Sequence, residues 1–305
     1  MKFDLCCQGG GSKIPALAGG YEAIVNHGFT LSHAIGTSAG AIMAAIAVAG
    51  YTTLEIKNIL LNTEFSSFLD GGRLKLYNIL VHNGIYKGDK LYHFIDDLLK
   101  NKGITTFGDL KYDHYDPKYQ YRFKAVTCDV TNSKIAIFPD NLPDYGINPD
   151  TFEVAKAIRC SISIPFWFRP IKISRSMFVD GGVGSNYAIW AFDSEDEPSH
   201  PTFGLSLYTN QDSAPKKTNN PIRLTKALLA TMLQSHDKQF IRPDDFINRT
   251  ISIPVGDTSP IDFGLSQEKK QWLFNQGTIA ANNFLDQWSW NRYKRWCVNS
   301  RSRNL

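Results

Sequence analysis

Short apolar runs alternate with longer segments of helical periodicity along this chain of 305 residues. The runs Phe3 to Cys7 and Phe29 to Ile35 are brief and β-prone, whereas Ala41 to Ala49 is Ala-rich and suits a buried helix. The pattern predicts a strand and helix over 3–27, a second such unit over 29–50, a helix-rich insert over about 53–110, strands near 121–138, a helix from Thr151 to Arg159, and strands over 171–179 and 202–209. This alternation is typical of the α/β class.

Two polar stretches interrupt the pattern in the second half of the chain. Residues 193–201 are acidic and contain proline, which predicts a surface loop, and residues 210–221 are polar and loop-like. We therefore predict a core over 1–209 and a C-terminal helical extension over 210–305 that packs on it. Hydrophobic residues make up 43% of the chain, enough for a large buried core.

Ser38 stands between the second predicted strand and the Ala-rich helix, inside Gly36-Thr37-Ser38-Ala39-Gly40. Many hydrolases present a serine nucleophile in this way, with the free N–H groups of the new helix directed at the reacting oxygen. Gly36 and Gly40 allow the strand and the helix to pack closely around a strained turn. The pattern arises by chance in roughly one chain in ten of this length, so a tight turn with an incidental serine is the alternative.

Two further glycine-rich segments also follow predicted strands. Gly9-Gly10-Gly11-Ser12-Lys13 leaves backbone N–H groups uncovered for an anion. Asp180-Gly181-Gly182 places a carboxylate at the end of the apolar run 177–179. Because ligands bind beyond the carboxyl ends of the strands in an open α/β sheet, we expect the serine, the glycine loop and the carboxylate to converge there.

These three motifs, in this order, resemble the patatin-like phospholipase family. Further segments carry the resemblance. Residues 84–91 resemble the opening of a family helix, and residues 125–129 resemble the family's Ala-Thr-Asp strand region. Residues 160–166 resemble the family's Ala-Ser-x-x-x-Pro block, and Asn186 falls where the family often has Asn-Pro. The likeness covers roughly residues 3–209 and departs from the family at Ile14, Tyr187 and Cys160. It implies a three-layer α/β sandwich, with a mostly parallel sheet, helices on both faces and a nucleophile elbow.

The resemblance also implies an activity, that of a phospholipase A-type acyl hydrolase acting on carboxylic esters of membrane phospholipids. Ser38 is then the nucleophile and Asp180 the base, and the oxyanion hole is formed by N–H groups of Gly9, Gly10 and Gly11. The motifs are supported by Lys13, Gly36, Gly40, Gly181 and Gly182; Lys13 either positions the loop or an anionic headgroup, or is a solvated loop charge. Because an aspartate with its usual pKa is a weak base at neutral pH, we expect burial to raise the pKa of Asp180.

Other hypotheses remain beside the Ser–Asp dyad. A Ser–Asp–His triad of a neutral-ester esterase or lipase would take its histidine from His200 or His236, although both lie in polar stretches and are expected at the surface. A nucleotide-binding loop at Gly9 to Gly11 would need Gly or Ala where the chain has Ile14. An inactive scaffold is disfavoured by the intact Ser38 and Asp180.

The net charge of +4 is local, because residues 292–305 hold five basic residues and no acid, and the rest of the chain sums to −1. Next to Trp288, Trp290 and Trp296, this tail would suit an anionic membrane surface. The helical spacing of Leu273, Ala280, Phe284 and Trp288 instead favours a terminal packing helix over 267–296. The basic footprint is too thin to predict a nucleic-acid partner.

We expect a cytoplasmic protein that contacts its phospholipid substrate peripherally. The start of the chain lacks an apolar signal region, and no run reaches the ~20 apolar residues that span a bilayer. Cys6, Cys7, Cys128, Cys160 and Cys297 are odd in number and lack zinc-ligand spacing, which predicts reduced thiols. Neither a metal nor a cofactor is expected, and the sequence leaves open a homo-oligomer and a small-molecule activator.

The helix-rich insert contains apolar residues whose role the sequence does not decide. They are Phe65, Phe68, Leu69, Leu76, Ile79 and Leu80. Ordinary core packing is the expectation for each of them, and an acyl-chain pocket is the alternative for some.

Overall fold

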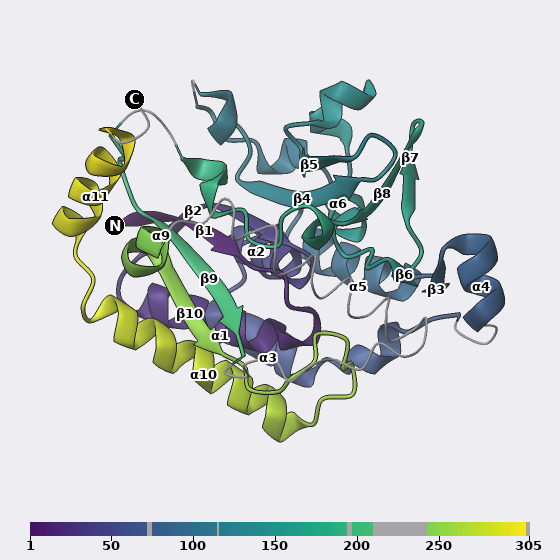
Figure 1. Cartoon of the computed structure of the whole chain (residues 1–305), viewed down its shortest axis with the longest axis horizontal. Helices are drawn as coiled ribbons and strands as arrows, with labels where there is room; N and C mark the ends of the chain where they lie inside the picture. The colour runs from purple at the N-terminus through teal and green to yellow at the C-terminus, as the bar shows by residue number, and fades with distance from the viewer. Residues whose placement is uncertain (72–74, 115, 194–196, 210–242, 303–305) are drawn as a thin grey trace.

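The computed structural model describes residues 1–71, 75–114, 116–193, 197–209 and 243–302 (Figure 1). The strands are β1 (Lys2–Cys7), β2 (Thr30–Thr37), β3 (Gly84–Tyr86), β4 (Phe123–Asp129), β5 (Lys134–Phe138), β6 (Phe166–Phe168), β7 (Ile171–Ile173), β8 (Ser176–Asp180), β9 (Thr202–Tyr208) and β10 (Thr250–Pro254). The α-helices are α1 (Ile14–Asn26), α2 (Ala39–Val48), α3 (Thr53–Asn62), α4 (Lys75–His82), α5 (Asp89–Lys100), α6 (Val154–Ser161), α9 (Pro243–Arg249), α10 (Gln267–Leu285) and α11 (Trp290–Ser302).

The central sheet has the strand order β10-β9-β1-β2-β4-β8-β7, with β5 also paired to β4. From β10 to β4 the neighbouring strands are parallel, whereas β5 and β8 run antiparallel to β4, and β7 antiparallel to β8. The predicted α/β class with a mostly parallel sheet is therefore confirmed. A second, two-stranded sheet joins β3 and β6.

β2 and β8 approach each other end to end along one edge of β4. Thr37, the last residue of β2, pairs with Val126, and Asp180, the last residue of β8, pairs with Thr127. β5 takes the opposite edge of β4, since it pairs with the same residues of that strand. Because β2 is parallel and β8 antiparallel to β4, their carboxyl ends meet at two consecutive residues of β4.

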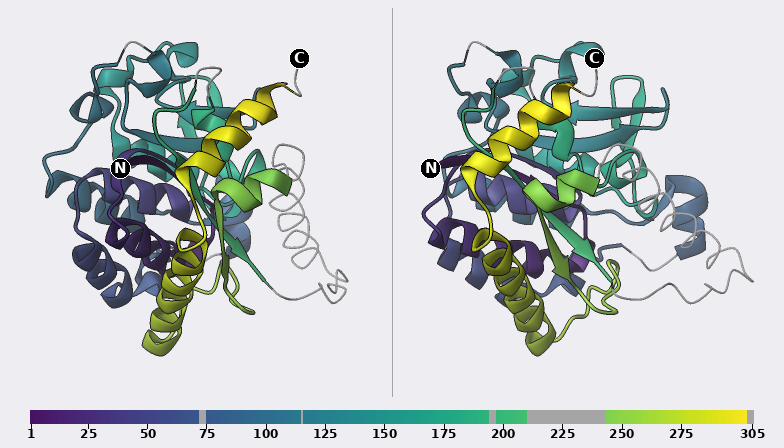
Figure 2. Two further views of the ribbon diagram at one scale, coloured as in Figure 1. Left: turned by 90° about the vertical axis from the view of Figure 1, so that its left-hand side faces the viewer. Right: turned by 60° about the vertical axis from the view of Figure 1, so that its left-hand side comes forward.

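The main hydrophobic core lies between one face of the sheet and a layer of helices that includes α1, α2, α5 and α10 (Figure 2). Helices α1 and α10 pack with their backbones almost in contact: a Cβ at Gly19 would lie 1.9 Å from the Phe274 carbonyl oxygen, and one at Gly277 1.9 Å from that of Ala16. In the described part of the chain, the opposite face carries a smaller cluster beneath the 3-10 segment Ile189–Phe192.

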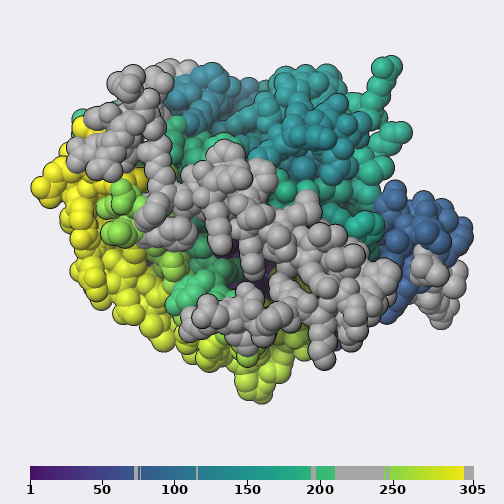
Figure 3. All heavy atoms as spheres, viewed as in Figure 1, coloured from purple at the N-terminus to yellow at the C-terminus, as the bar shows by residue number. Residues whose placement is uncertain are grey.

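The C-terminal part of the chain is built into the same body as the core. β10 extends the central sheet beside β9, α10 packs on α1, and α10 and α11 form one side of the molecule, opposite α4 (Figure 3). Trp288 makes edge-on contacts with Phe29 and Phe203, and the Tyr293 hydroxyl accepts a hydrogen bond of 3.0 Å from the Thr202 amide. These contacts support the packing role of the terminal aromatic residues. The division at residue 209 stays a prediction, although the segment beyond it supplies a strand as well as helices.

Three local predictions differ from the structure. The segment 171–179, predicted as one strand, is the hairpin β7–β8, which turns at Ser174 with φ 52°. The single helix predicted over 267–296 is divided into α10 and α11. In the insert, Leu80 is 75% exposed and so does not pack in the core, and the side chain of Leu76 lies outside the described residues. Among the described helices, none combines the length and the apolar character that crossing a membrane requires.

Candidate active site

Ser38 occupies a sharp turn between β2 and α2, as the sequence predicts. Its backbone has φ 54° and ψ −127°, a strained conformation for a residue with a side chain. Strand and helix almost touch at this turn, since a Cβ at Gly36 would lie 2.2 Å from the Gly40 carbonyl oxygen. The Ser38 amide donates to Ser161 Oγ over 2.8 Å, and Ser161 in turn donates to the Val126 carbonyl over 2.6 Å. Ser161 therefore fixes the nucleophile turn to β4.

Asp180 lies beside Ser38 because β2 and β8 end at neighbouring residues of β4. The carboxylate is buried, with 3% of the residue exposed. Its Oδ1 accepts a hydrogen bond of 2.8 Å from the Gly182 amide, whereas its Oδ2 is buried without a fully formed hydrogen bond among the described residues. Burial raises the pKa of Asp180 to about 6, and hydrogen bonding to Ser38 and to the Gly182 amide opposes this shift. The direction agrees with the expectation from the sequence.

The loop Gly9 to Gly11 lies beside the Ser38 turn, since a Cβ at Gly40 would lie 2.3 Å from the Cys7 carbonyl oxygen. The Gly9 amide donates to the Asn186 carbonyl over 3.0 Å and is therefore already satisfied. Within the described chain, the amides of Gly10 and Gly11 donate to no protein acceptor. Of the three predicted oxyanion-hole donors, Gly10 and Gly11 have an N–H group that no acceptor of the described residues occupies. Gly11 has φ 55°, which favours glycine.

Lys13 follows the glycine loop and is more enclosed than a solvated loop charge would be. Burial lowers the pKa of its ammonium group to about 8. No carboxylate in the described part of the chain forms an ion pair with it. Its positive charge is therefore available for an interaction with an anionic ligand near the loop.

The segment 259–263 also supports the glycine loop, and nothing in the sequence signals this role. The Ser12 amide donates to the Pro260 carbonyl over 3.0 Å, and Ser12 Oγ donates to the Ser259 carbonyl over 3.0 Å. A Cβ at Gly11 would lie only 1.8 Å from the Pro260 carbonyl oxygen. A stretch of the C-terminal part of the chain therefore sets the position of the free amides.

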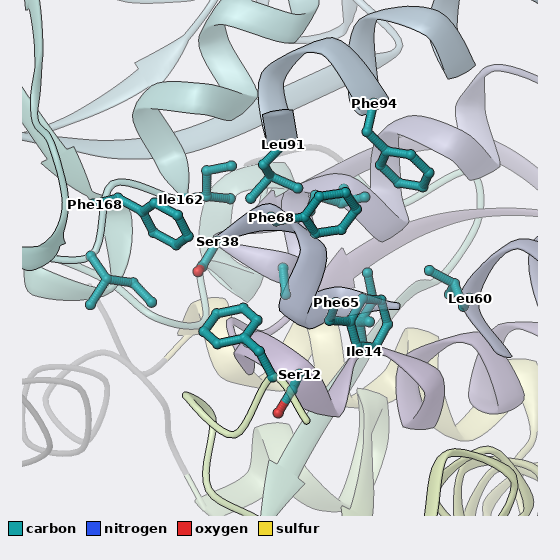
Figure 4. Close-up of a pocket in the computed structure, with 15 residues that line it drawn as sticks. Ser12, Ile14, Ser38, Leu60, Phe65, Phe68, Leu91, Phe94, Ile162 and Phe168 are labelled. Atoms are coloured by element: carbon teal, nitrogen blue, oxygen red, sulfur yellow. The ribbon is translucent and has the colours of Figure 1, made fainter. Parts of the chain in front are cut away.

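An apolar pocket opens at Ser38, with a cavity volume of about 50 Å³ inside an open hollow of about 530 Å³ (Figure 4). Apart from Gly11, Ser12 and Ser38, its walls are carbon side chains: Ile14, Ala39, Ile42, Leu60, Phe65, Phe68, Leu91, Phe94, Ile162, Ile164, Phe168 and Phe263. Phe65 and Phe68 of the insert are among them, while Leu69, Ile79 and Leu80 are not. The pocket suits a hydrocarbon chain and offers it almost no polar partner.

The histidines of the alternative triad do not complete this site. His200 contacts Asp4, with 3.0 Å between Nε2 and Oδ1, and His236 lies outside the described residues. Among the histidines that the structure describes, none forms a hydrogen bond with Ser38 or Asp180. Within the described chain, Asp180 is instead the carboxylate next to Ser38.

Comparison with known proteins decides the family. The model of the patatin-like phospholipase family matches residues 5–193, which contain the Ser38 turn, the glycine loop and Asp180. The chain belongs to the patatin-like phospholipase family.

Two curated relatives are similar to this chain in sequence, and two solved structures are similar to it in fold. YqhO of Bacillus subtilis (strain 168) is 38% identical over 302 residues, covering 95% of this chain and all of YqhO. "Probable lipid hydrolase 463L" of Invertebrate iridescent virus 6 is 26% identical over 256 residues, covering 83% of this chain and 78% of the viral protein. The patatin-like fold resembles VipD from Legionella pneumophila, with TM-score 0.60, 15% identity and coverage of 93% of this chain and 66% of VipD. The type III effector ExoU of Pseudomonas aeruginosa gives TM-score 0.52, 15% identity and 93% and 53% coverage.

Ser161 is a residue of this patatin-like site to which sequence reasoning assigned no role. The signal was present, because residues 160–166 resemble the family's Ala-Ser-x-x-x-Pro block. The sequence did not show that this serine accepts from the Ser38 amide, since the two residues are 123 positions apart. Asn186, also part of the resemblance, bonds to both polar groups of the Gly9 backbone.

Proposed function

We propose that this protein hydrolyses a carboxylic ester of membrane phospholipids by forming a covalent acyl-enzyme on Ser38. The observation that carries the proposal is the meeting of Ser38 and Asp180 beside the free amides of Gly10 and Gly11, at an apolar pocket. Nucleophile, base, oxyanion donors and acyl-chain site are the four parts that such a reaction needs.

In the acylation step, Ser38 Oγ attacks the ester carbonyl carbon while Asp180 takes the serine proton. The raised pKa of Asp180 brings its proton affinity closer to that required at neutral pH. The carbonyl oxygen becomes an oxyanion, to which the amides of Gly10 and Gly11 donate hydrogen bonds. As the tetrahedral intermediate collapses, the bond to the leaving alcohol breaks and Asp180 returns the proton to that oxygen.

In the deacylation step, water attacks the acyl-enzyme while Asp180 accepts one of its protons. The same two amides stabilise the second oxyanion. The bond between Ser38 Oγ and the acyl carbon then breaks, Ser38 Oγ regains its proton from Asp180, and a free fatty acid leaves. Acylation and deacylation thus use the same base, Asp180, in turn. A dyad without a histidine is therefore sufficient for both steps.

The surroundings of the dyad favour a lipid ester over a polar one. The carbon-lined pocket would hold the acyl chain, and the desolvated charge of Lys13 would attract the phosphate of a headgroup. We place the reaction at the cytoplasmic surface of a membrane, with the protein bound peripherally. Cys7, Cys128 and Cys160 are buried free thiols, which fits a reducing compartment.

The test is fatty-acid release from vesicles of phosphatidylcholine, phosphatidylglycerol and lysophospholipid, measured by mass spectrometry, with triglyceride emulsions as a neutral comparison. We expect release from phospholipid, its loss in Ser38→Ala, and normal release from Ser67→Ala, which removes an exposed hydroxyl whose hydrogen bond in the described chain is to the Glu64 carbonyl of its own turn. A fluorophosphonate probe should label wild type at Ser38. Absence of both labelling and release in folded protein would refute the proposal.

A further inference from the structure

A second polar cluster lies at the amino ends of the strands, away from the Ser38 site. Asp4 belongs to β1, His33 to β2, and His200 lies two residues before β9. These three strands are neighbours in the sheet, in the order β9-β1-β2. Their carboxyl ends lead instead to the glycine loop and to the Ser38 turn, so the cluster and the proposed active site occupy opposite ends of the same strands.

An irregularity in the pairing of β1 and β2 accompanies this cluster. Phe3 pairs with Leu31 and Leu5 with Ala34, so that Asp4 lies opposite two residues, Ser32 and His33. Such a bulge redirects a side chain, and bulges of this kind recur at functional sites. Here it is accompanied by a contact of 3.3 Å between His33 Nδ1 and Asp4 Oδ1.

The three side chains converge through single atoms. His33 Nδ1 lies 3.3 Å and His200 Nε2 3.0 Å from Asp4 Oδ1, and all three atoms lie within 4.8 Å of one another. Asp4 and His33 are each 2% exposed, and the His200 side chain is 16% exposed. A tetrahedral zinc ion with bonds of about 2.0–2.2 Å needs ligand atoms about 3.3 Å apart. The two distances from Asp4 Oδ1, 3.3 Å and 3.0 Å, are close to this value, and the distance between the two histidine nitrogens is at most 4.8 Å.

In each histidine, one ring nitrogen belongs to the cluster and the other bonds outside it. The outer bond indicates whether the nitrogen in the cluster carries a proton. His33 Nε2 lies 3.2 Å from the Tyr119 carbonyl oxygen, which can only accept, so Nε2 carries a proton. In the neutral imidazole, Nδ1 then carries a lone pair that faces both Ser32 Oγ, 3.0 Å away, and Asp4 Oδ1, 3.3 Å away. His200 Nδ1 lies 2.8 Å from Ser199 Oγ, and when that hydroxyl accepts, His200 Nε2 carries a lone pair in the buried space beside Asp4 Oδ1, with which it forms no hydrogen bond. A cation bound between these three atoms would satisfy both ring nitrogens and the carboxylate at once.

We propose that Asp4, His33 and His200 form a structural binding site for a divalent transition-metal ion, with zinc the best match to the ligand set. Two imidazole nitrogens and one carboxylate oxygen are ligands that zinc accepts, with water in the fourth position. The outer contacts are those that metal-binding groups need: His33 Nε2 to the Tyr119 carbonyl, His200 Nδ1 to Ser199, and the His33 amide to Asp4 Oδ1 over 3.2 Å. The ion would join β1, β2 and the segment before β9.

The competing explanation is protonation of the rings, with Asp4 neutralised by imidazolium instead of metal. The two explanations differ in stoichiometric metal content and in the response of stability to zinc. Neither readout depends on ester hydrolysis, so this proposal and the proposed function can fail separately.

The experiment compares wild type with His200→Ala and His93→Ala after treatment with a chelator and dialysis against buffered zinc. His200 is the most accessible of the three ligands, so we expect its removal to damage the fold least, and His93 is an exposed histidine on α5. We expect about one zinc ion per wild-type chain by elemental mass spectrometry, with a rise in melting temperature on zinc addition. The expected loss in His200→Ala is about tenfold or more in zinc affinity, and His93→Ala should match wild type.

Cobalt provides a second measurement. Co²⁺ in the same site should give visible absorption bands in wild type and in His93→Ala that are absent in His200→Ala. The proposal is overturned if wild type retains no more zinc than His200→Ala, if zinc leaves its melting temperature unchanged, or if His93→Ala loses as much metal as His200→Ala.

Discussion

Asp180 and Asp129 are buried carboxylates at the ends of paired strands, and they differ in the number of hydrogen-bond donors around them. Asp129 ends β4, where it pairs with Phe178 of β8, and Asp180 ends β8, where it pairs with Thr127 of β4. Asp129 accepts hydrogen bonds from the amides of Thr131 and Asn132, from Asn132 Nδ2 and from the Tyr145 hydroxyl. Asp180 accepts a well-formed hydrogen bond from the Gly182 amide alone among the described residues.

The difference in donors decides the proton affinity of each group. Burial would raise the pKa of both carboxyls. At Asp129 the hydrogen bonds from Asn132, Ser176 and Tyr145 outweigh burial and hold the pKa below its usual value. At Asp180 burial prevails and the pKa rises to about 6. A buried aspartate therefore becomes a candidate base through a shortage of donors, not through burial alone.

The largest expected effect comes from replacing each carboxylate by its amide. Asp180→Asn removes the proposed base, and we expect ester hydrolysis to fall by about 10³–10⁴-fold, at the upper end of what general base catalysis contributes. Asp129→Asn should cost about 1–3 kcal/mol of stability by disturbing buried hydrogen bonds, with hydrolysis per folded molecule within a few-fold of wild type. Initial rates of fatty-acid release, together with circular dichroism, measure both effects.

Equal losses of hydrolysis rate in Asp180→Asn and Asp129→Asn would contradict this assignment, because Asp180 would then not be the specific base. Loss of activity in His200→Ala to the level of Asp180→Asn would instead restore the triad hypothesis. The position of His200 beside Asp4 argues against that result.

The next effect concerns stability and has opposite signs at the two sites. Because the folded-state pKa of Asp180 lies above the value of about 3.9 for an unfolded aspartate, the folded protein holds a proton between about pH 4 and pH 6 that the unfolded chain releases. Its contribution to the free energy of unfolding is therefore fully present below about pH 4 and lost as the pH rises through 6. Asp180→Asn should be more stable than wild type at pH 7–8 by up to about 2–3 kcal/mol, and equal to it near pH 4.

Asp129 should show the reverse behaviour. Its lowered pKa contributes stability above the unfolded value, which is lost as the pH falls through the folded value. Denaturant unfolding of wild type and both variants from pH 4 to pH 8 tests the pair. The rate of the wild-type enzyme should also decline below about pH 6, where Asp180 becomes protonated. An Asp180→Asn variant that is less stable than wild type at pH 8 would contradict the account of the base.

The sequence was sufficient to predict the parts of the site that are local. The Gly36–Gly40 turn, the glycine loop and Asp180-Gly181-Gly182 each carry their signal within a few residues, and each follows a strand as predicted. The α/β class followed from the alternation of short and long apolar segments. The resemblance to the family supplied the order and the roles, which spacing alone would have left open.

Features that depend on contacts between distant residues were not predictable. The support of the glycine loop by Pro260 joins residues 248 or more positions apart, and no pattern near Pro260 marks it. His200 looked like a surface residue in an acidic loop, yet it contacts the buried Asp4. The hairpin at Ser174 was missed because its turn carries neither glycine nor proline, and Ser174 itself adopts a positive φ.

The smallest expected effect concerns the positioning of the nucleophile and is tested by two neighbouring serines. Ser161 and Ser163 are both fully buried and differ in their partners. Ser161 accepts from the Ser38 amide and donates to the Val126 carbonyl, whereas Ser163 bonds to the Arg159 side chain and backbone. Each change to alanine should cost about 1–3 kcal/mol of stability, since it leaves buried polar groups unsatisfied. Ser161→Ala should in addition lower kcat by about tenfold, because a displaced nucleophile loses the alignment needed for attack.

The readout that separates the two roles is the split between kcat and KM at a temperature where both variants are folded. For Ser161→Ala we expect a lower kcat with little change in KM, and Ser161→Thr, which keeps a hydroxyl at the same place, should recover part of the rate. For Ser163→Ala we expect wild-type kcat. If the two alanine variants lose kcat to the same extent, Ser161 acts only through general stability, and the strained turn at Ser38 is maintained by β2 and α2 alone.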